Sequence, residues 1–323
     1  MMKNKIKNMP KVELHLHLDG SVSLETASRL SGLSIDQCKE KMIANEKCQN
    51  LSEYLTKFDF PISLMQTEEN LKKVAENLVQ NLAKQNVIYA EIRFAPMFHT
   101  KKGLSYEKIV EAVLQGLNTN SRIKTNLILC LMRGMETEEN LKTLQTAEKY
   151  LNKGVCAIDL AGDEGVYPID NYLELFNLAK EKGIPFTIHA GESGGAEEIR
   201  KAINIGAKRI GHGIHCLENE DVVKLIHDKK ILLEICPTSN IQTRAVKEYS
   251  SHPIYKLYKK GIYTCVNTDN VTVSNISLTE EYFKLAENFN FAFKDFKQMN
   301  IYALEKAFIK AQEKEELMKL YQE

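Results

Sequence analysis

Short apolar runs rich in β-branched residues alternate along this chain with longer stretches in which apolar residues recur every three or four positions. An apolar run of about four to eight residues is typical of a buried strand, and the three-and-four spacing is typical of an amphipathic helix. The first pattern predicts strands at residues 12–17, 87–94, 126–132, 156–161, 185–190, 209–212, 231–236 and 262–268. The second predicts helices at residues 68–84, 106–117, 138–151, 171–181, 196–204, 221–227 and 254–260.

This regular alternation predicts an α/β fold built from βαβ units around a parallel sheet. Eight such units favour a closed (β/α)₈ barrel of the TIM type over an open doubly wound sheet, because no glycine fingerprint follows the first strand. Barrels of this kind commonly occupy a chain of this length as one unit. With no linker, repeat or low-complexity tract in the sequence, we expect a single domain over residues 1–323.

Two helical regions fall outside the alternation. Residues 23–66 are too many for a simple crossover and predict an extra helical segment between the first two strands. Within it, residues 51–65 are expected to fold over the mouth of the barrel as a lid. Residues 278–321 predict two or three further helices packed outside the barrel.

Charge and cysteine content narrow the classes of partner. Lys plus Arg number 43, and so do Asp plus Glu, so no net field favours nucleic acid or a membrane surface, and a small molecule is the expected partner. No window approaches the roughly 18 apolar residues of a membrane span, and no exposed apolar stripe indicates an oligomeric state. The seven cysteines are odd in number and lack a Cys-x-x-Cys pair. We expect buried thiols, neither disulfides nor metal ligands, in a cytoplasmic protein.

Polar residues gather where the predicted strands end. His15 and His17 are two positions apart on the first strand and therefore share a face, although such a pair alone equally suits ordinary half-buried histidines. His189 ends the fifth strand and Asp269 follows the eighth, and the strand ends of a barrel meet on one face. Three imidazoles and a carboxylate suit one Zn²⁺ best, with Fe²⁺, Co²⁺ and Mn²⁺ left open. Such a site lowers the pKa of bound water from about 15.7 toward about 7, which favours hydrolysis.

Six short motifs span nearly the whole chain: His15-Leu-His17-Leu-Asp19-Gly20, Asp159-Leu-Ala-Gly162-Asp163-Glu164, His189-Ala-Gly-Glu192, Gly211-His212-Gly213, Cys236-Pro-Thr-Ser-Asn240 and Asn267-Thr268-Asp269. Together and in this order they resemble the adenosine deaminase family of the amidohydrolase superfamily. The resemblance implies a (β/α)₈ barrel with one zinc ion. It also implies hydrolysis of adenosine to inosine and ammonia, and of deoxyadenosine to deoxyinosine.

The same resemblance implies a role for each motif residue. The metal ligands would be His15, His17, His189 and Asp269. Glu192 would protonate purine N1, and His212 would orient or deprotonate the attacking water. The substrate would be bound by His17, Asp19 at the ribose, the Gly162 backbone at purine N3, and Asn270. A protonated carboxyl near N1 makes physical sense, because attack at C6 pushes charge onto N1.

Three of these residues also have plainer interpretations. Glu192 precedes Ser193-Gly-Gly and could be a solvated residue at the start of the next helix. His212 could be an ordinary core histidine, although the glycine on each side favours a close approach to another group. Gly162 could serve only a turn at the end of a strand.

Asn270 departs from the family pattern, in which a second aspartate follows the metal-binding one and meets purine N7. The asparagine amide carries an N–H donor and can keep that contact. Three other interpretations stay open: an adenine deaminase, a methylthioadenosine-type deaminase, and a catalytically silent nucleoside-binding relative. Asp19 favours a nucleoside over adenine and does not suit a thioether. Intact metal-ligand and acid positions favour an enzyme over a binding protein.

Overall fold

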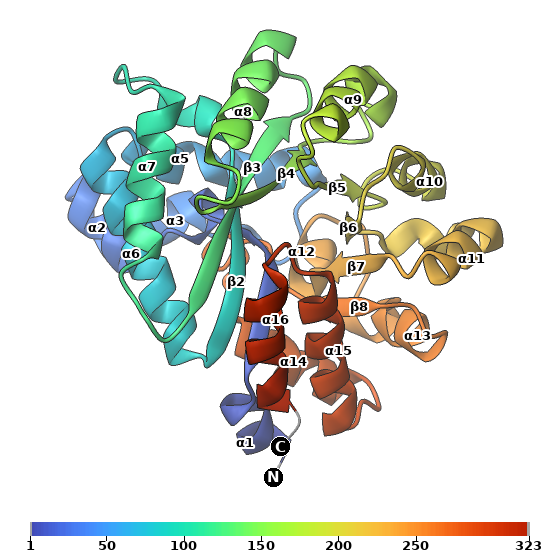
Figure 1. Ribbon diagram of the computed structural model, residues 1–323. Helices are drawn as coiled ribbons and strands as arrows, with labels where there is room; N and C mark the ends of the chain where they lie inside the picture. Colours follow the sequence, from blue (N-terminus) through green and yellow to red (C-terminus); the bar gives the residue numbers. More distant parts are fainter. Residues whose placement is uncertain (1, 322–323) are drawn as a thin grey trace.

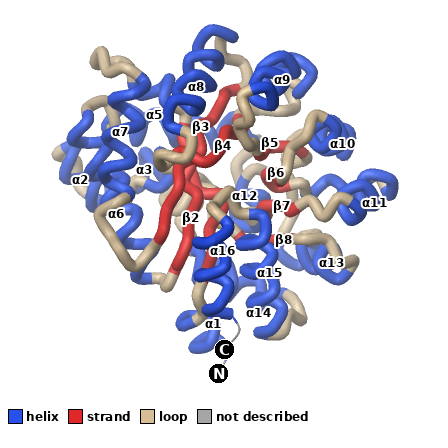
Figure 2. Tube along the Cα trace, viewed as in Figure 1, coloured by secondary structure: helices blue, strands red, loops and turns tan. Residues whose placement is uncertain are grey.

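The computed structural model describes residues 2–321, and within them eight parallel strands form a barrel wall surrounded by helices (Figure 1, Figure 2). The strands are β1 (Lys11–His17), β2 (Val87–Phe94), β3 (Lys124–Met132), β4 (Val155–Ala161), β5 (Thr187–Ala190), β6 (Arg209–His212), β7 (Leu232–Ile235) and β8 (Thr264–Val266). Neighbouring strands pair in sequence order within two halves, β1 to β4 and β5 to β8. Single parallel bridges join the halves, between Ile158 and Phe186 and between Leu16 and Asp269. The predicted closed barrel is therefore present.

Side chains hold the seam between β8 and β1. Asn267 Oδ1 accepts the backbone N–H groups of Leu14 at 2.9 Å and His15 at 3.2 Å, and Asn300 Oδ1 accepts the N–H of Val12 at 2.8 Å. The strand predicted at residues 262–268 therefore runs past β8 at both ends. At Leu14 and His15 an asparagine side chain takes the place of a backbone acceptor, and backbone hydrogen bonds of Asp269 with His15 and His17 continue the pairing beyond β8. An apolar pattern does not reveal this arrangement.

Crossover helices cover the outside of the barrel. They are α7 (Tyr106–Leu117), α8 (Thr137–Tyr150), α9 (Leu173–Glu181), α10 (Ala196–Asn204), α11 (Glu220–Asp228) and α13 (Ile254–Lys259). The short helix α12 (Pro237–Gln242) lies instead inside this ring, at the end of β7 (Figure 1). The helix α6 (Glu68–Lys84) precedes β2 and illustrates how the spacing of apolar residues predicts a helix. Its buried face comprises Leu71, Val74, Ala75, Leu78, Val79 and Leu82, spaced by one, three or four positions. The short α12 was not predicted, because its residues are polar yet fully enclosed at the end of β7.

The two additional helical regions are present. Between β1 and α6 lie α2 (Leu24–Ser31), α3 (Ile35–Met42), α4 (Leu51–Leu55) and α5 (Asp59–Leu64). After β8 come α14 (Leu278–Asn288), α15 (Phe293–Lys306) and α16 (Ala311–Met318). The helix α1 (Met2–Asn8), which the pattern did not predict, contacts α14 and α15 and buries only Ile6. A helix with one buried residue has almost no periodicity to detect.

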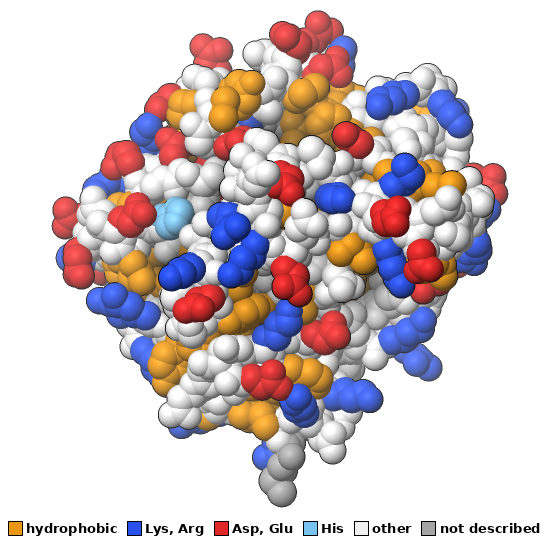
Figure 3. Space-filling model, turned by 180° about the vertical axis from the view of Figure 1, so that it is seen from behind, with side chains coloured by type: hydrophobic (Ala, Val, Ile, Leu, Met, Phe, Trp, Pro, Cys, Tyr) orange, Lys and Arg blue, Asp and Glu red, His pale blue; other side chains and the backbone are white. Residues whose placement is uncertain are grey.

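The outer surface carries mixed charge. On the face drawn in Figure 3, Lys and Arg side chains are interspersed with Asp and Glu, as the equal totals of 43 and 43 suggest. Among residues 2–321, no helix is both long enough and apolar enough to cross a membrane.

Candidate metal centre and active site

The register of the parallel strands brings polar residues to one layer inside the barrel. Pairing sets His189 opposite Gly211, and Gly211 in turn opposite Glu234 on β7. On the other half, His17 lies opposite Arg93. Residues far apart in the sequence therefore meet at the ends of the strands, the face on which barrel active sites are built.

Four predicted ligands converge in this layer. One ligand atom from each of His15, His17, His189 and Asp269 lies within 4.8 Å of all the others. The Nε2 atoms of His17 and His189 are 3.3 Å apart, and Asp269 Oδ1 lies 3.4 Å from His17 Nε2 and 3.5 Å from His15 Nε2. His15 Nε2 is buried without a hydrogen-bond partner. Three nitrogens and one oxygen at this spacing fit a divalent cation.

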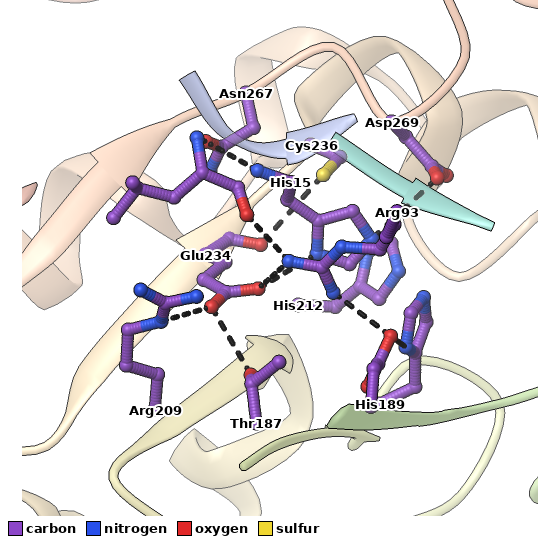
Figure 4. Close-up of polar contacts among 12 residues, drawn as sticks. His15, Arg93, Thr187, His189, Arg209, His212, Glu234, Cys236, Asn267 and Asp269 are labelled. Carbon is purple, nitrogen blue, oxygen red and sulfur yellow. Dashed lines mark hydrogen bonds and ion pairs between the residues drawn. The ribbon is translucent and has the colours of Figure 1, made fainter. Parts of the chain in front are cut away.

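Buried carboxylates orient two of the imidazoles. His15 Nδ1 lies 3.0 Å from Glu234 Oε2, and His189 Nδ1 lies 2.9 Å from Asp159 Oδ2 (Figure 4). A carboxylate next to Nδ1 holds the proton there and leaves the Nε2 lone pair free for a metal. Arg93 donates to both carboxylates, at 2.8 Å to Glu234 and 2.9 Å to Asp159. Two of the four predicted ligands are therefore held from behind by one buried ionic network.

The protonation states of three of the four predicted ligands suit metal binding. At the fourth, His189, the Asp159 carboxylate outweighs burial and raises the pKa, so this imidazole must give up a proton to bind a metal. Burial lowers the pKa of His15 and of His17, so both imidazoles are neutral at pH 7. Burial alone raises the pKa of Asp269, but the contact of its Oδ1 with His15 Nε2 at 3.5 Å and the other nearby imidazoles outweigh burial and hold this pKa well below its usual range. Neutral imidazole and ionised carboxylate are the forms that coordinate a cation.

Backbone conformation at the site is restricted. His212 and Asp269 both have positive φ, 61° and 60°, a region that residues other than glycine seldom adopt. Gly211 leaves room for the first ligand, because a Cβ there would lie 3.0 Å from His15 Cε1. Strain of this kind concentrates at functional sites, where the surrounding structure maintains it.

The predicted acid, Glu192, is buried beside this group. Glu164 fixes the turn that carries it, accepting the backbone N–H groups of Gly191 and Ser193 at 2.8 Å each. Thr243 Oγ1 donates to Glu192 Oε1 at 3.2 Å. Burial, together with the negative charge of Asp269, raises the pKa of Glu192 to about 8. The carboxyl is therefore mainly protonated at neutral pH, and it is not the solvated helix-start residue of the plainer interpretation.

His212, which is predicted to orient or deprotonate the attacking water, lies close to Glu192. Its Nε2 is 3.5 Å from Glu192 Oε2 and has no hydrogen-bond partner. The Asn240 amide lies between two histidines, with Nδ2 at 2.9 Å from His212 Nδ1 and Oδ1 at 3.3 Å from His252 Nε2. In either orientation the amide offers one ring a donor and the other an acceptor, so both neutral tautomers of His212 can be accommodated.

A cavity of about 580 Å³ opens over these groups. The predicted substrate residues His17, Asp19, Gly162 and Asn270 all line it. Its other wall is the predicted lid, whose lining residues are Leu51, Tyr54, Leu55, Phe58, Asp59 and Ile62. Asn270 Nδ2 donates to Tyr54 Oη at 3.0 Å, which ties the loop after β8 to α4. Burial raises the pKa of Asp19 to about 6.

The chain matches a known protein family over nearly its whole length. The family model described as adenosine deaminase matches residues 10–323. The chain belongs to the adenosine deaminase family. It is 41% identical to an adenosine deaminase of Clostridium perfringens over 96% of this chain and 97% of that relative. The family and the deaminase class predicted from the motifs are confirmed.

Solved structures agree on the architecture. An adenine deaminase from Arthrobacter aurescens is 25% identical, with a TM-score of 0.86, and the match covers 97% of this chain and 98% of that one. An amidohydrolase from Burkholderia ambifaria, solved with bound Zn, has a TM-score of 0.88 at 20% identity, covering 99% of this chain and 91% of that one. Both confirm the predicted barrel fold.

Sequence reasoning missed the residues that support the site from behind. Arg93, Glu234 and Asp159 lie inside predicted strands and Glu164 in a loop, and none was assigned a role. A signal was available, since Asp159 and Glu234 each interrupt an otherwise apolar buried strand, and Arg93 lies two positions after Glu91 in another buried strand. A charged residue is almost never fully buried without a partner, so each of them indicated a buried ionic network.

Proposed function

We propose that this chain hydrolyses adenosine and deoxyadenosine to inosine and deoxyinosine, with release of ammonia. The observation that carries the proposal is the pairing of a buried carboxyl, Glu192, with a group of three histidines and one aspartate that line the same cavity or lie beside it. Aromatic deamination needs an acid at the ring nitrogen and an activated water at the neighbouring carbon. This cavity offers a place for both.

Zinc is the proposed cofactor, one per chain, held by His15, His17, His189 and Asp269. Imidazole and carboxylate donors of this kind suit Zn²⁺, and the His15 Nε2 atom, which has no hydrogen-bond partner among the described residues, supports its presence. When bound, the ion supplies the Lewis acidity that makes water nucleophilic near neutral pH.

The protein groups then have distinct roles. His212 takes a proton from the attacking water as oxygen bonds to purine C6, and Glu192 gives its proton to N1 as charge develops there. The amino group leaves as ammonia once it is protonated. Enclosure by the apolar lid keeps bulk water away from these transfers.

Three residues position the substrate in this proposal. Asp19 accepts a hydrogen bond from a ribose hydroxyl, and the N–H of Gly162 meets purine N3. Gly162 has φ of 103°, a conformation that suits glycine and turns the backbone toward the cavity. Asn270 donates its second amide hydrogen to N7, since the first is used by Tyr54.

We further propose one domain over residues 1–323 and a cytoplasmic location. All seven cysteines are buried and free, a state that a reducing compartment maintains.

The test is an ultraviolet assay with adenosine and, in separate reactions, with adenine. Each substrate is assayed with the protein as purified, with protein stripped of metal by a chelator, and with stripped protein to which zinc has been returned. Turnover of adenosine alone, lost on chelation and regained with zinc, supports substrate and cofactor together. Turnover of adenine alone would overturn the role of Asp19. Binding of adenosine without turnover by the zinc-loaded protein would identify a silent relative.

A further inference from the structure

A second set of potential ligands overlaps the first. It shares His15 and Asp269 but replaces the other two histidines by His212 and Cys236, and its four ligand atoms also lie within 4.8 Å of one another. Cys236 follows β7 directly and precedes α12, and it is fully buried. Figure 4 shows its sulfur beside the His15 side chain. The barrel thus places a thiol against the predicted metal centre.

Two nitrogens of this set lack partners. His15 Nε2 and His212 Nε2 are both buried and make no hydrogen bond to any residue within 2–321. In the same part of the chain, the only hydrogen bond of the Cys236 sulfur is a weak one, 3.7 Å to the backbone oxygen of Glu234. Unpartnered buried polar atoms are costly, and atoms that face a common point are what a cation site requires.

We propose that Cys236 creates an alternative position for the cation, bound by His15, His212, Cys236 and Asp269, and that Cd²⁺ occupies it. The two positions exclude each other. Because His15 Nδ1 faces Glu234, only the Nε2 lone pair of this ring is free, and it can bind one ion at a time. Each chain therefore holds a single ion, in one position or the other.

The softness of the ion decides between the positions. The first set offers three nitrogens and one oxygen, and the alternative set offers two nitrogens, one oxygen and one sulfur. Thiolate ligands favour soft cations, so a sulfur ligand in the set raises the affinity for Cd²⁺ more than the affinity for a harder ion. As the sulfur–cadmium bond forms, the Cys236 thiol releases its proton to solvent.

Given the proposed function, a cation in the alternative position prevents deamination. His212 becomes a ligand and can no longer accept a proton from water, while His17 and His189 lose the ion. The Cd²⁺ form is therefore expected to be inactive, although the binding itself does not depend on the reaction.

The experiment titrates Cd²⁺ into the chelator-stripped full chain and follows the ultraviolet thiolate-to-cadmium absorption band. We expect the band to saturate at one equivalent, to be lost in Cys236→Ser while one equivalent still binds, and to be retained in Cys130→Ser. Cys130 is the matched control, since it is buried and lines the same cavity. Circular dichroism verifies that each variant is folded.

Three results would overturn the proposal: a band that persists in folded Cys236→Ser, a band that needs a second equivalent, or stoichiometric Cd²⁺ binding by the wild type without any band. If Cys236→Ser does not fold, cadmium-113 NMR of the wild type reports a sulfur ligand directly, and a shift typical of nitrogen and oxygen ligands alone contradicts the proposal. None of these readouts uses adenosine. Failure of the deaminase assay would therefore leave the result intact.

Discussion

Glu192→Gln removes a transferable proton while keeping the size of the side chain and one N–H donor. With a pKa of about 8 in the absence of an ion, the carboxyl is roughly nine-tenths protonated at pH 7. General acid catalysis contributes about 10²- to 10⁴-fold. We therefore expect kcat to fall by this factor, which corresponds to about 3 to 5 kcal/mol of activation free energy. KM is expected to change little, because the amide still donates to N1.

The assay is steady-state deamination of adenosine, with metal content measured on every preparation. Glu197→Gln is the matched control, since Glu197 lies on α10 in an exposed ion pair with Arg200 at 3.0 Å and does not line the cavity. A kcat/KM for Glu192→Gln within about threefold of wild type, less than 1 kcal/mol, at unchanged metal content would refute the assigned role.

The same assignment predicts an alkaline limb in the pH profile. The acid acts only when protonated, so activity is present below the pKa of Glu192 and is lost as pH rises through it. In the absence of an ion this pKa is about 8, and a bound cation nearby favours the carboxylate and lowers it. The midpoint in the loaded enzyme is expected below 8. The residual activity of Glu192→Gln should lack this limb, and its persistence would point to another group.

Three other changes test the rest of the site. Asn270→Ala is expected to weaken substrate capture and raise KM, and an unchanged kcat/KM would remove Asn270 from the site. Glu234→Gln places an amide N–H₂ among the donors that now surround the carboxylate, so metal affinity measured by chelator competition should fall by about 10- to 100-fold. Gly211→Ala puts a Cβ 3.0 Å from His15 Cε1 and should displace that ligand, and full metal occupancy in a folded variant would contradict this packing argument.

Local pattern was sufficient for much of the fold. The bounds of β2, β6, α6, α7 and α10 match the predicted ranges, because each of these elements is long or sharply bounded and buries a continuous face. The eighth strand is present but shorter than predicted, at 264–266 in place of 262–268, and the prediction missed α1 and α12. The residues of α12 are buried although most of them are polar, and α1 buries only Ile6, so the apolar pattern along the chain does not mark either helix.

The sequence by itself determined the element order, the family, and which histidines and carboxylates were worth considering, because motif spacing and apolar periodicity are local properties. Only the tertiary structure decided which groups meet. Strand register set Glu234 and Asp159 behind His15 and His189, and barrel closure brought Cys236, expected to be an inert thiol, against the same centre. A linear pattern records which side chains are buried. Which residues surround a buried charge depends on the pairing of strands that are far apart in the chain. It also depends on distances of a few ångströms, which separate one ligand set from the other.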